Sequence, residues 1–294
     1  LYQKKNKSMN NNIGLVLEGG GMRGAFTCGV LDYLIDNHIK FPYGIGVSAG
    51  AGNGLSYISN QKGRGKYTTV DLMRDRQYIS LSNLIFKGSL IDMNLLYEEL
   101  PQKLYPYDFE AYKNNPAEYE IVTTNCETGK ACYFQKQDTE KNLVQIARAS
   151  GSLPYISPII TIDGIPMLDG GLADSIPVKR AMEKGYKNCV VVLTRNKGYR
   201  KKRSHFPMPD FMYRKYPLLQ ETLKNRHALY NQQLDLVDQL ENEGKILVIR
   251  PKNPVEVDRI EKDAIKLEKL YLEGYECAKS ANVEQFIKRI ENRV

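Results

Sequence analysis

The sequence has few of the features that build disulfide frameworks, metal sites or membrane spans. Its five cysteines are odd in number and form no C-x-x-C pair, which argues against a disulfide framework and a zinc site. No stretch approaches the roughly 20 apolar residues that a transmembrane helix needs. The first apolar run, Ile13–Leu17, ends at Glu18 and is too short for a signal peptide. With no calcium-loop motif either, we expect a cytoplasmic protein without a metal or a cofactor.

The composition is that of a globular protein. The chain has 294 residues, of which 42% are hydrophobic and 26% are charged, so it can bury a sizeable core as one large α/β domain or two small ones. The net charge of +8 favours an anionic partner, such as lipid headgroups or nucleic acid, without choosing between them.

The N-terminal sixty residues predict a βαβ unit. Ile13–Leu17 and Tyr43–Val47 are expected strands, and residues 25–37 and 49–59 are expected helices. Such a unit implies a parallel sheet with a right-handed crossover. The glycine-rich segments that follow the two strands should then lie side by side at the carboxyl edge of the sheet, where open α/β sheets place their ligands.

The second of these segments has the pattern G-x-S-x-G and contains Ser48. Its other members are Gly46, Val47, Ala49 and Gly50. The pattern suits a nucleophile elbow, in which a strand turns sharply into a helix and exposes the serine oxygen. The alternative is a turn of small residues that packs a helix closely on the sheet.

The first segment matches G-x-G-x-x-G and consists of Gly19, Gly20, Gly21, Met22, Arg23 and Gly24. A dinucleotide site would need an acidic residue near the end of the second strand, which instead ends in Val47 and Ser48. No Gly-Lys-Ser/Thr follows, so a phosphate-binding Walker loop is also excluded. We therefore predict an oxyanion hole, with Gly20 and Gly21 as the main N–H donors.

A third glycine-rich turn, Asp169-Gly170-Gly171, follows a predicted hairpin at Asp163-Gly164. A carboxylate presented on such a turn could act as a general base toward Ser48. An Asp-Gly-Gly sequence is also compatible with an ordinary turn.

In this order, the three motifs resemble those of the patatin-like phospholipases, and most closely of the bacterial members. The resemblance extends from Ile13 to Val192 and includes Arg148–Pro154. It implies a three-layer α/β/α fold with a mostly parallel sheet. It also implies that Ser48 is the nucleophile, Asp169 its base in a Ser-Asp dyad, and the glycine loop the oxyanion hole. Glu18 stands where many relatives have Asp, and Gly171 where many have Ala; both replacements are mild.

The histidines give little support to a Ser-His-Asp triad. In α/β-hydrolases the histidine follows the serine and the acid, which leaves only His205 and His227, because His38 precedes Ser48. Neither follows a strand with a turn signal. The sequence thus favours the dyad.

The implied reaction is acyl transfer to Ser48, with water then hydrolysing the acyl-enzyme. Because a carboxylate is a weak base, orientation and the oxyanion hole must supply more of the rate, and we expect modest turnover. The substrate is expected to be a phospholipid or lysophospholipid. A soluble carboxylesterase or thioesterase, or an idle binding module of the same fold, remain alternatives. Arg23 either steadies the loop or the aspartate, or is a surface cation.

The C-terminal part is expected to hold a helix over 218–240, a strand over 245–251, and helices over 257–280 and 283–290. We predict an acyl hydrolase domain over 10–250 and a helical extension over 251–294 packed on the same domain. The basic run 195–203 precedes several apolar residues: Phe206, Met208, Phe211, Met212 and Tyr213. The run either docks on anionic lipid or forms a solvated loop. No nucleic-acid-binding module surrounds it, and no oligomeric state is predicted.

Overall fold

The framework of the fold is one eight-stranded sheet. The computed structural model describes residues 12–139, 142–203 and 210–292. The strands are β1 (Ile13–Leu17), β2 (Tyr43–Val47), β3 (Glu118–Asn125), β4 (Ala131–Phe134), β5 (Ile160–Ile162), β6 (Ile165–Asp169), β7 (Asn188–Val192) and β8 (Ile246–Ile249). Their order is β5-β6-β3-β2-β1-β7-β8, and β4 also pairs with β3. The neighbouring strands β3, β2, β1, β7 and β8 pair in parallel. Strands β4 and β6 pair antiparallel with β3, and β5 pairs antiparallel with β6. The predicted α/β class is confirmed.

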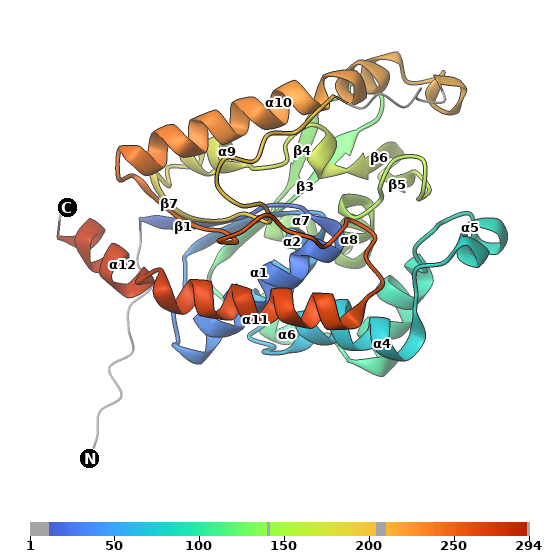
Figure 1. The fold of residues 1–294 in the computed structure, drawn as a ribbon. Helices are drawn as coiled ribbons and strands as arrows, with labels where there is room; N and C mark the ends of the chain where they lie inside the picture. The colour runs from blue at the N-terminus through green and yellow to red at the C-terminus, as the bar shows by residue number, and fades with distance from the viewer. Residues whose placement is uncertain (1–11, 140–141, 204–209, 293–294) are drawn as a thin grey trace.

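The sheet is covered by helices on both faces (Figure 1). The longer helices are α1 (Gly24–Asp36), α2 (Ala49–Ile58), α8 (Leu143–Ser150), α10 (Pro217–Asn242), α11 (Ala264–Ser280) and α12 (Val283–Glu291). The shorter ones are α3 (Arg64–Lys66), α4 (Leu72–Arg76), α5 (Leu81–Lys87), α6 (Phe109–Asn114), α7 (Lys136–Thr139) and α9 (Val178–Glu183). Five 3₁₀ or π segments complete the set: η1 (Gly21–Arg23), η2 (Tyr67–Asp71), η3 (Leu95–Leu104), η4 (Gly170–Leu172) and η5 (Asp210–Tyr213). Within the described residues, no helix combines the length and the apolar character that crossing a bilayer requires.

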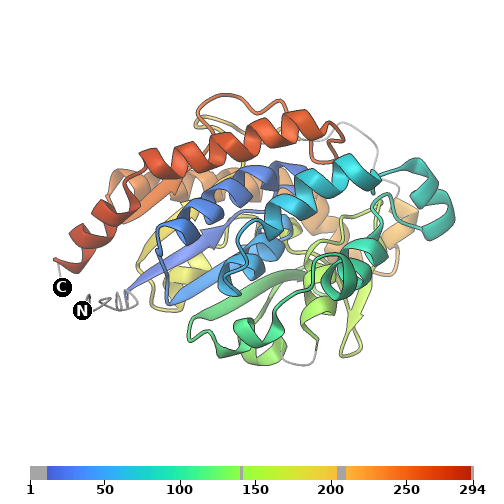
Figure 2. The ribbon, with the colours of Figure 1, turned by 90° about the horizontal axis from the view of Figure 1, so that it is seen from below.

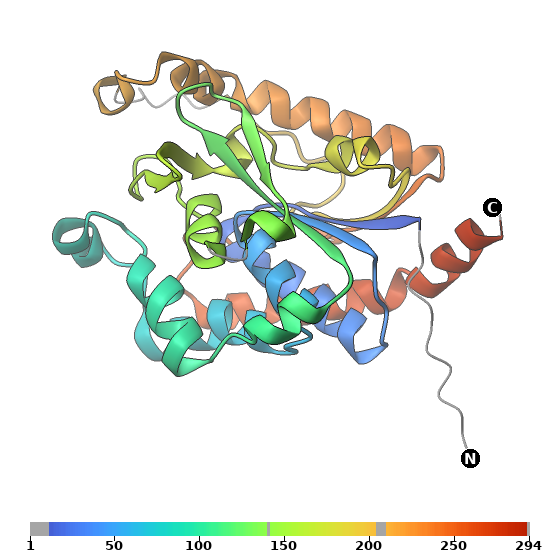
Figure 3. The same ribbon diagram turned by 180° about the vertical axis from the view of Figure 1, so that it is seen from behind.

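Both faces of the central strands are apolar because each face has its own core. Leu15 and Leu17 of β1 pack into the core that also contains side chains of α1, α2, α8 and α11. Val16 packs on the other face of the sheet, with side chains of α9 and α10. Figure 3 shows, from behind, the helices that cover this face. This explains why β1 and β7 are continuous apolar runs and not alternating ones.

Helix α11 lies along α1 (Figure 2), and the backbones of the two helices are in close contact. A methyl group at Gly29 of α1 would collide with the carbonyl of Tyr271, and one at Gly274 of α11 would collide with the carbonyl of Phe26. The two helices thus meet through paired glycines, and α11 is part of the main core.

We expect Gly274→Ala to lower the free energy of unfolding by about 1–3 kcal/mol, because the added methyl forces the two helices apart. Urea unfolding followed by circular dichroism measures this change. The matched control is Gly52→Ala in α2, where the added Cβ meets no atom within 4 Å. There we expect about 0.5–1 kcal/mol of stabilisation. Equal stabilities for the two variants would contradict the packing described here.

The structure corrects the start of one predicted helix. The helix expected over 257–280 begins only at Ala264, where the Asp263 side chain accepts hydrogen bonds from the backbone N–H groups of the first turn. The residues before it are not helical, and the carbonyl of Arg259 there accepts a hydrogen bond from the N–H of Met22.

Candidate active site

Ser48 occupies a strained turn between β2 and α2. Its φ of 55° and ψ of −124° lie outside the regions that L-residues favour. The turn is close to neighbouring backbone: a Cβ at Gly46 would lie 2.7 Å from the Cα of Ala51, and one at Gly50 would lie 2.6 Å from the carbonyl oxygen of Glu18. Both glycines of the pattern are therefore required by the close approach, as in a nucleophile elbow.

A buried hydrogen-bond chain holds the elbow to β3. The backbone N–H of Ser48 donates to the Ser150 hydroxyl over 2.8 Å, and this hydroxyl donates to the carbonyl of Val122 over 2.6 Å. Ser150 lies within the Arg148–Pro154 segment, but sequence reasoning gave it no role. The contact spans 102 positions, which no local pattern could reveal.

Asp169 is the last residue of β6, and one of its two carboxylate oxygens is held by a hydrogen bond. Its Oδ1 accepts a 2.7 Å hydrogen bond from the N–H of Gly171, and its own N–H donates to Ser152 over 2.8 Å. Its Oδ2 is buried and has no hydrogen-bond partner among the described residues. Asp169 and Ser48 line one narrow cavity together with Gly19, Gly20 and Gly21, hereafter the glycine-loop cavity.

The hydrogen bonds of the glycine loop determine which N–H groups are free. Met22 donates to the carbonyl of Arg259, Arg23 to Gly20, and Gly24 to Gly21 and Met22. Among the described residues, the N–H groups of Gly19, Gly20 and Gly21 have no such acceptor. Of the six residues in the predicted oxyanion loop, these three retain donors for a developing negative charge.

The side chain of Glu18 anchors the start of the glycine loop to neighbouring elements. Its Oε1 accepts from the Tyr230 hydroxyl over 2.5 Å, and its Oε2 accepts from both the N–H and the hydroxyl of Thr194. The side chain is buried. Glu18 therefore ties β1 to the end of β7 and to α10, a role that the sequence did not reveal.

A second cavity, of about 170 Å³, adjoins the first at Ser48. Its wall is mainly apolar and includes Leu55, Leu96, Leu100, Leu143, Ala147 and Leu153. Part of the segment 72–104 thus lines this apolar cavity. An apolar cavity beside a nucleophile can hold a hydrocarbon chain.

The described histidines lie elsewhere. His227 is on an exposed part of α10, with its Nδ1 3.2 Å from the carbonyl of Lys224, and neither it nor His38 lines either cavity. His205 lies outside the described residues, as do Phe206 and Met208. In the part of the chain that the structure describes, no three His, Cys, Asp or Glu side chains gather as metal ligands.

Comparison with known proteins gives two matching family models, one protein of similar sequence and one solved structure of similar fold. A model described as patatin-like phospholipase matches residues 15–182, and one described as a domain of unknown function (DUF6363) matches residues 216–291. The uncharacterized protein YjjU of Escherichia coli K12 is 32% identical over 195 residues, which cover 62% of this chain and 52% of that protein. VipD of Legionella pneumophila has a similar fold, with a TM-score of 0.51 and 13% identity over 92% of this chain and 66% of that chain.

These matches bear on family and on fold. The chain spans about half of the E. coli protein, and the likeness to VipD at 13% identity concerns the fold alone. The second family model begins inside the domain predicted over 10–250, so that boundary stays a prediction. The first model covers more than half of the chain and includes both Ser48 and Asp169. The chain belongs to the patatin-like phospholipase family.

Proposed function

We propose that the protein is a serine acyl hydrolase that cleaves acyl esters of phospholipids or lysophospholipids with a Ser48–Asp169 dyad. Family membership implies a lipid acyl hydrolase. The observation that carries the proposal is the position of Ser48 on a strained elbow, where the glycine-loop cavity and the apolar cavity meet. An ester could lie over Ser48 with its chain in the apolar cavity and its carbonyl oxygen at the glycine loop.

In the proposed reaction, Oδ2 of Asp169 takes the proton as Oγ of Ser48 attacks the ester carbonyl. The N–H groups of Gly19, Gly20 and Gly21 stabilise the negative charge on the carbonyl oxygen. The carbon–oxygen bond to the alcohol then breaks, and the alcohol leaves with the proton from Asp169. Water attacks the acyl-enzyme with the same base and releases the fatty acid.

The direct test is covalent labelling combined with hydrolysis. The intact protein is treated with a fluorophosphonate, and the modified residue is located by mass spectrometry. Hydrolysis of p-nitrophenyl esters of increasing chain length is measured alongside that of dispersed phospholipid, lysophospholipid and an acyl thioester. We expect label on Ser48, rates that rise with chain length, and release of fatty acid from lipid.

Other results would favour the alternatives. Labelling with hydrolysis of short esters or thioesters only would indicate a soluble esterase or thioesterase. A folded protein that is neither labelled nor active would be an idle binding module. A double variant, His205→Ala with His227→Ala, should retain activity; its inactivation would replace the dyad by a triad.

We further propose peripheral contact with an anionic membrane. Helix α5 and segment η5 project at the same end of the molecule (Figures 1 and 3). Their apolar side chains are exposed: Ile85 at 76%, Phe86 at 82% and Phe211 at 70%. Three cations of the basic run 195–203 are engaged within the protein: Arg200 pairs with Asp235 over 2.7 Å, Lys197 pairs with Glu241 over 3.6 Å, and Arg195 donates to the carbonyl of Val255. The exposed apolar side chains of α5 and η5 are therefore better candidates for lipid contact than the basic run 195–203.

Introducing charge at α5 tests this contact. We expect the double variant Ile85→Glu with Phe86→Glu to hydrolyse lipid in anionic vesicles at least about tenfold more slowly, because two apolar side chains no longer enter the bilayer. Rates on a dissolved short-chain ester serve as the reference. Leu272→Glu, at an exposed position of α11, is the control. An equal loss in this control, or no loss in the double variant, would contradict the proposed contact.

A further inference from the structure

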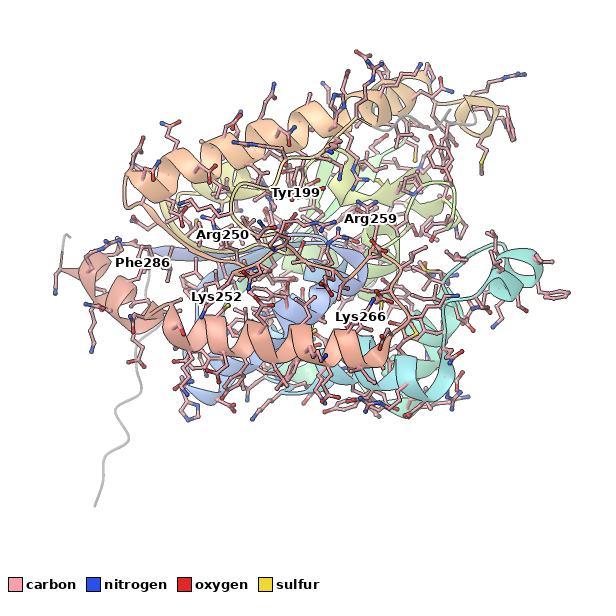
Figure 4. The ribbon with its side chains drawn as sticks, viewed as in Figure 1. Tyr199, Arg250, Lys252, Arg259, Lys266 and Phe286 are labelled. Carbon is pink, nitrogen blue, oxygen red and sulfur yellow. The ribbon has the colours of Figure 1, made fainter. Side chains whose placement is uncertain are left out.

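The glycine-loop cavity is lined by five cationic side chains. These are Arg23, Arg195, Lys201, Arg226 and Arg259. They come from the glycine loop, the loop after β7, helix α10 and the segment before α11. The two carboxylates in the lining are Glu18 and Asp169. Figure 4 labels Arg259 together with Tyr199, another residue of this lining, and both lie between α10 and α11 in that view.

Among the described residues, the five cations are not matched by close ion pairs, although Glu18 attracts Arg23 and Asp169 attracts Arg226 from a distance. Within the described ranges none of them forms an ion pair, although Arg200 of the same loop pairs with Asp235. Their contacts are to carbonyls and rings: Arg226 Nε donates to Gly171 over 2.7 Å, and Lys201 Nζ lies 4.9 Å from the centre of the Tyr230 ring. Arg23 is only 7% exposed, and its Nε has no hydrogen-bond partner among the described residues.

Gathering these charges is unfavourable in the absence of a ligand. Burial, together with Arg226 and Arg259, lowers the pKa of Lys201 to about 7. Burial and neighbouring cations likewise lower the pKa of Arg23 and that of Arg226 to about 10. Lowered pKa values mean that the protonated forms are disfavoured, first by burial and then by the neighbouring cations. Clusters of this kind are found at functional sites, where a ligand supplies the missing charge.

The carboxylates of the cavity do not supply that charge. Both oxygens of Glu18 are already occupied by Tyr230 and Thr194. Asp169 brings one negative charge, so the four arginines and Lys201 face two carboxylates, and a surplus of two positive charges remains when Lys201 is neutral and of three when it is protonated. A group with two negative charges would match this surplus better than a singly charged or zwitterionic one.

The two cavities meet at Ser48. Both are lined by Gly21, Ser48, Leu153 and Arg259. The glycine-loop cavity is the smaller, about 20 Å³ against about 170 Å³, so the acyl chain is assigned to the larger, apolar cavity. A substrate whose ester lies at Ser48 can therefore place an acyl chain on one side and a small anion on the other.

We propose that the glycine-loop cavity binds a terminal phosphate group, so that the substrate is an acyl ester of a phosphate monoester such as an acyl glycerol phosphate. Guanidinium groups match phosphate oxygens in geometry and charge. The inference rests on the proposed function, because it names the substrate class of the same site. It also assigns a role to the C-terminal region matched by DUF6363, which supplies Arg226 and Arg259.

The test compares esters that differ only in the headgroup. The ratio of kcat/KM for 1-acyl glycerol 3-phosphate to that for the monoacyl glycerol is measured, with the phosphocholine ester as a third substrate. We expect the phosphate ester to be preferred by about 10- to 100-fold, as for the loss of a charge-assisted hydrogen bond. Arg259→Gln and Lys201→Met should each lower the ratio by about tenfold or more. The backbone contact of Arg259 with Met22 persists in the first variant.

Arg200→Gln is the matched control, because Arg200 is a cation of the same loop that does not line the cavity. It should leave the ratio unchanged. Isothermal titration with inorganic phosphate gives a second, independent measurement on the same proteins. Phosphate should bind to the intact protein and to Arg200→Gln, and at least tenfold more weakly to the two cavity variants.

The two measurements separate the sources of the phosphate. A high ratio together with phosphate binding identifies a lipid headgroup. A ratio near one with cavity-dependent phosphate binding identifies free phosphate as the occupant. A ratio near one and no phosphate binding overturns the proposal. If no ester is hydrolysed at all, the proposed function fails, whereas titration with phosphate still decides whether the cavity binds the anion.

Discussion

Replacing Ser48 by alanine is expected to abolish fluorophosphonate labelling and to lower ester hydrolysis by at least about 10⁴-fold. Oγ of Ser48 is the atom that forms the acyl-enzyme in the proposed reaction, and removing a nucleophile eliminates the covalent route. The rate of p-nitrophenyl ester hydrolysis at saturating substrate measures this loss. The variant should fold, because the N–H of Ser48 that donates to Ser150 is retained.

The control for this variant is Ser59→Ala. Ser59 is also buried and ends the same helix, where its hydroxyl donates to the carbonyls of Leu55 and Ser56. It lines neither cavity. Full activity in Ser59→Ala and none in Ser48→Ala would place the chemistry at the elbow. Substantial residual labelling of Ser48→Ala would mean that another residue is the nucleophile.

The features that the sequence predicted well are local. The strand Tyr43–Val47 and the turn at Ser48 agree with the structure because apolar residues and close glycines mark them within a few positions. The hairpin at Asp163-Gly164 is found for the same reason, since a positive φ at both residues suits Asp and Gly. The start of α11 was predicted less well, since the helix was expected from residue 257 but begins at Ala264, after the Asp263 cap.

The features that it could not predict depend on distant contacts. Ser150 supports the elbow from 102 positions away, and Tyr230 binds Glu18 across 212 positions. The cations of the cavity are equally scattered: Arg226 lies on a helix and Arg259 in an irregular segment. Each looks like an ordinary surface cation in the sequence. Only the packing of α10 onto the sheet and of α11 onto α1 brings them to the glycine loop.

Asp169→Asn is expected to lower the hydrolysis rate by about 10²–10⁴-fold, the usual contribution of a general base. The asparagine can still accept the hydrogen bond from Gly171 that Oδ1 accepts now, but its amide cannot take the serine proton. The rate constant for hydrolysis and the rate of fluorophosphonate labelling should fall together, because both need an activated Ser48. Asp163→Asn, at the exposed turn of the same hairpin, is the matched control and should stay fully active.

A small effect of Asp169→Asn, alongside complete loss in Ser48→Ala, would require another base. Lys201 lines the same cavity, and its pKa of about 7 gives it a neutral form near physiological pH. A lysine acts as a base only when it is deprotonated, so activity would then rise as the pH increases through 7 and would be lost in Lys201→Met. With Asp169 as the base, Lys201→Met changes the preference for phosphate esters and retains this pH range of activity. The pH profile of Lys201→Met on a neutral ester therefore separates a lysine that binds phosphate from one that accepts the serine proton.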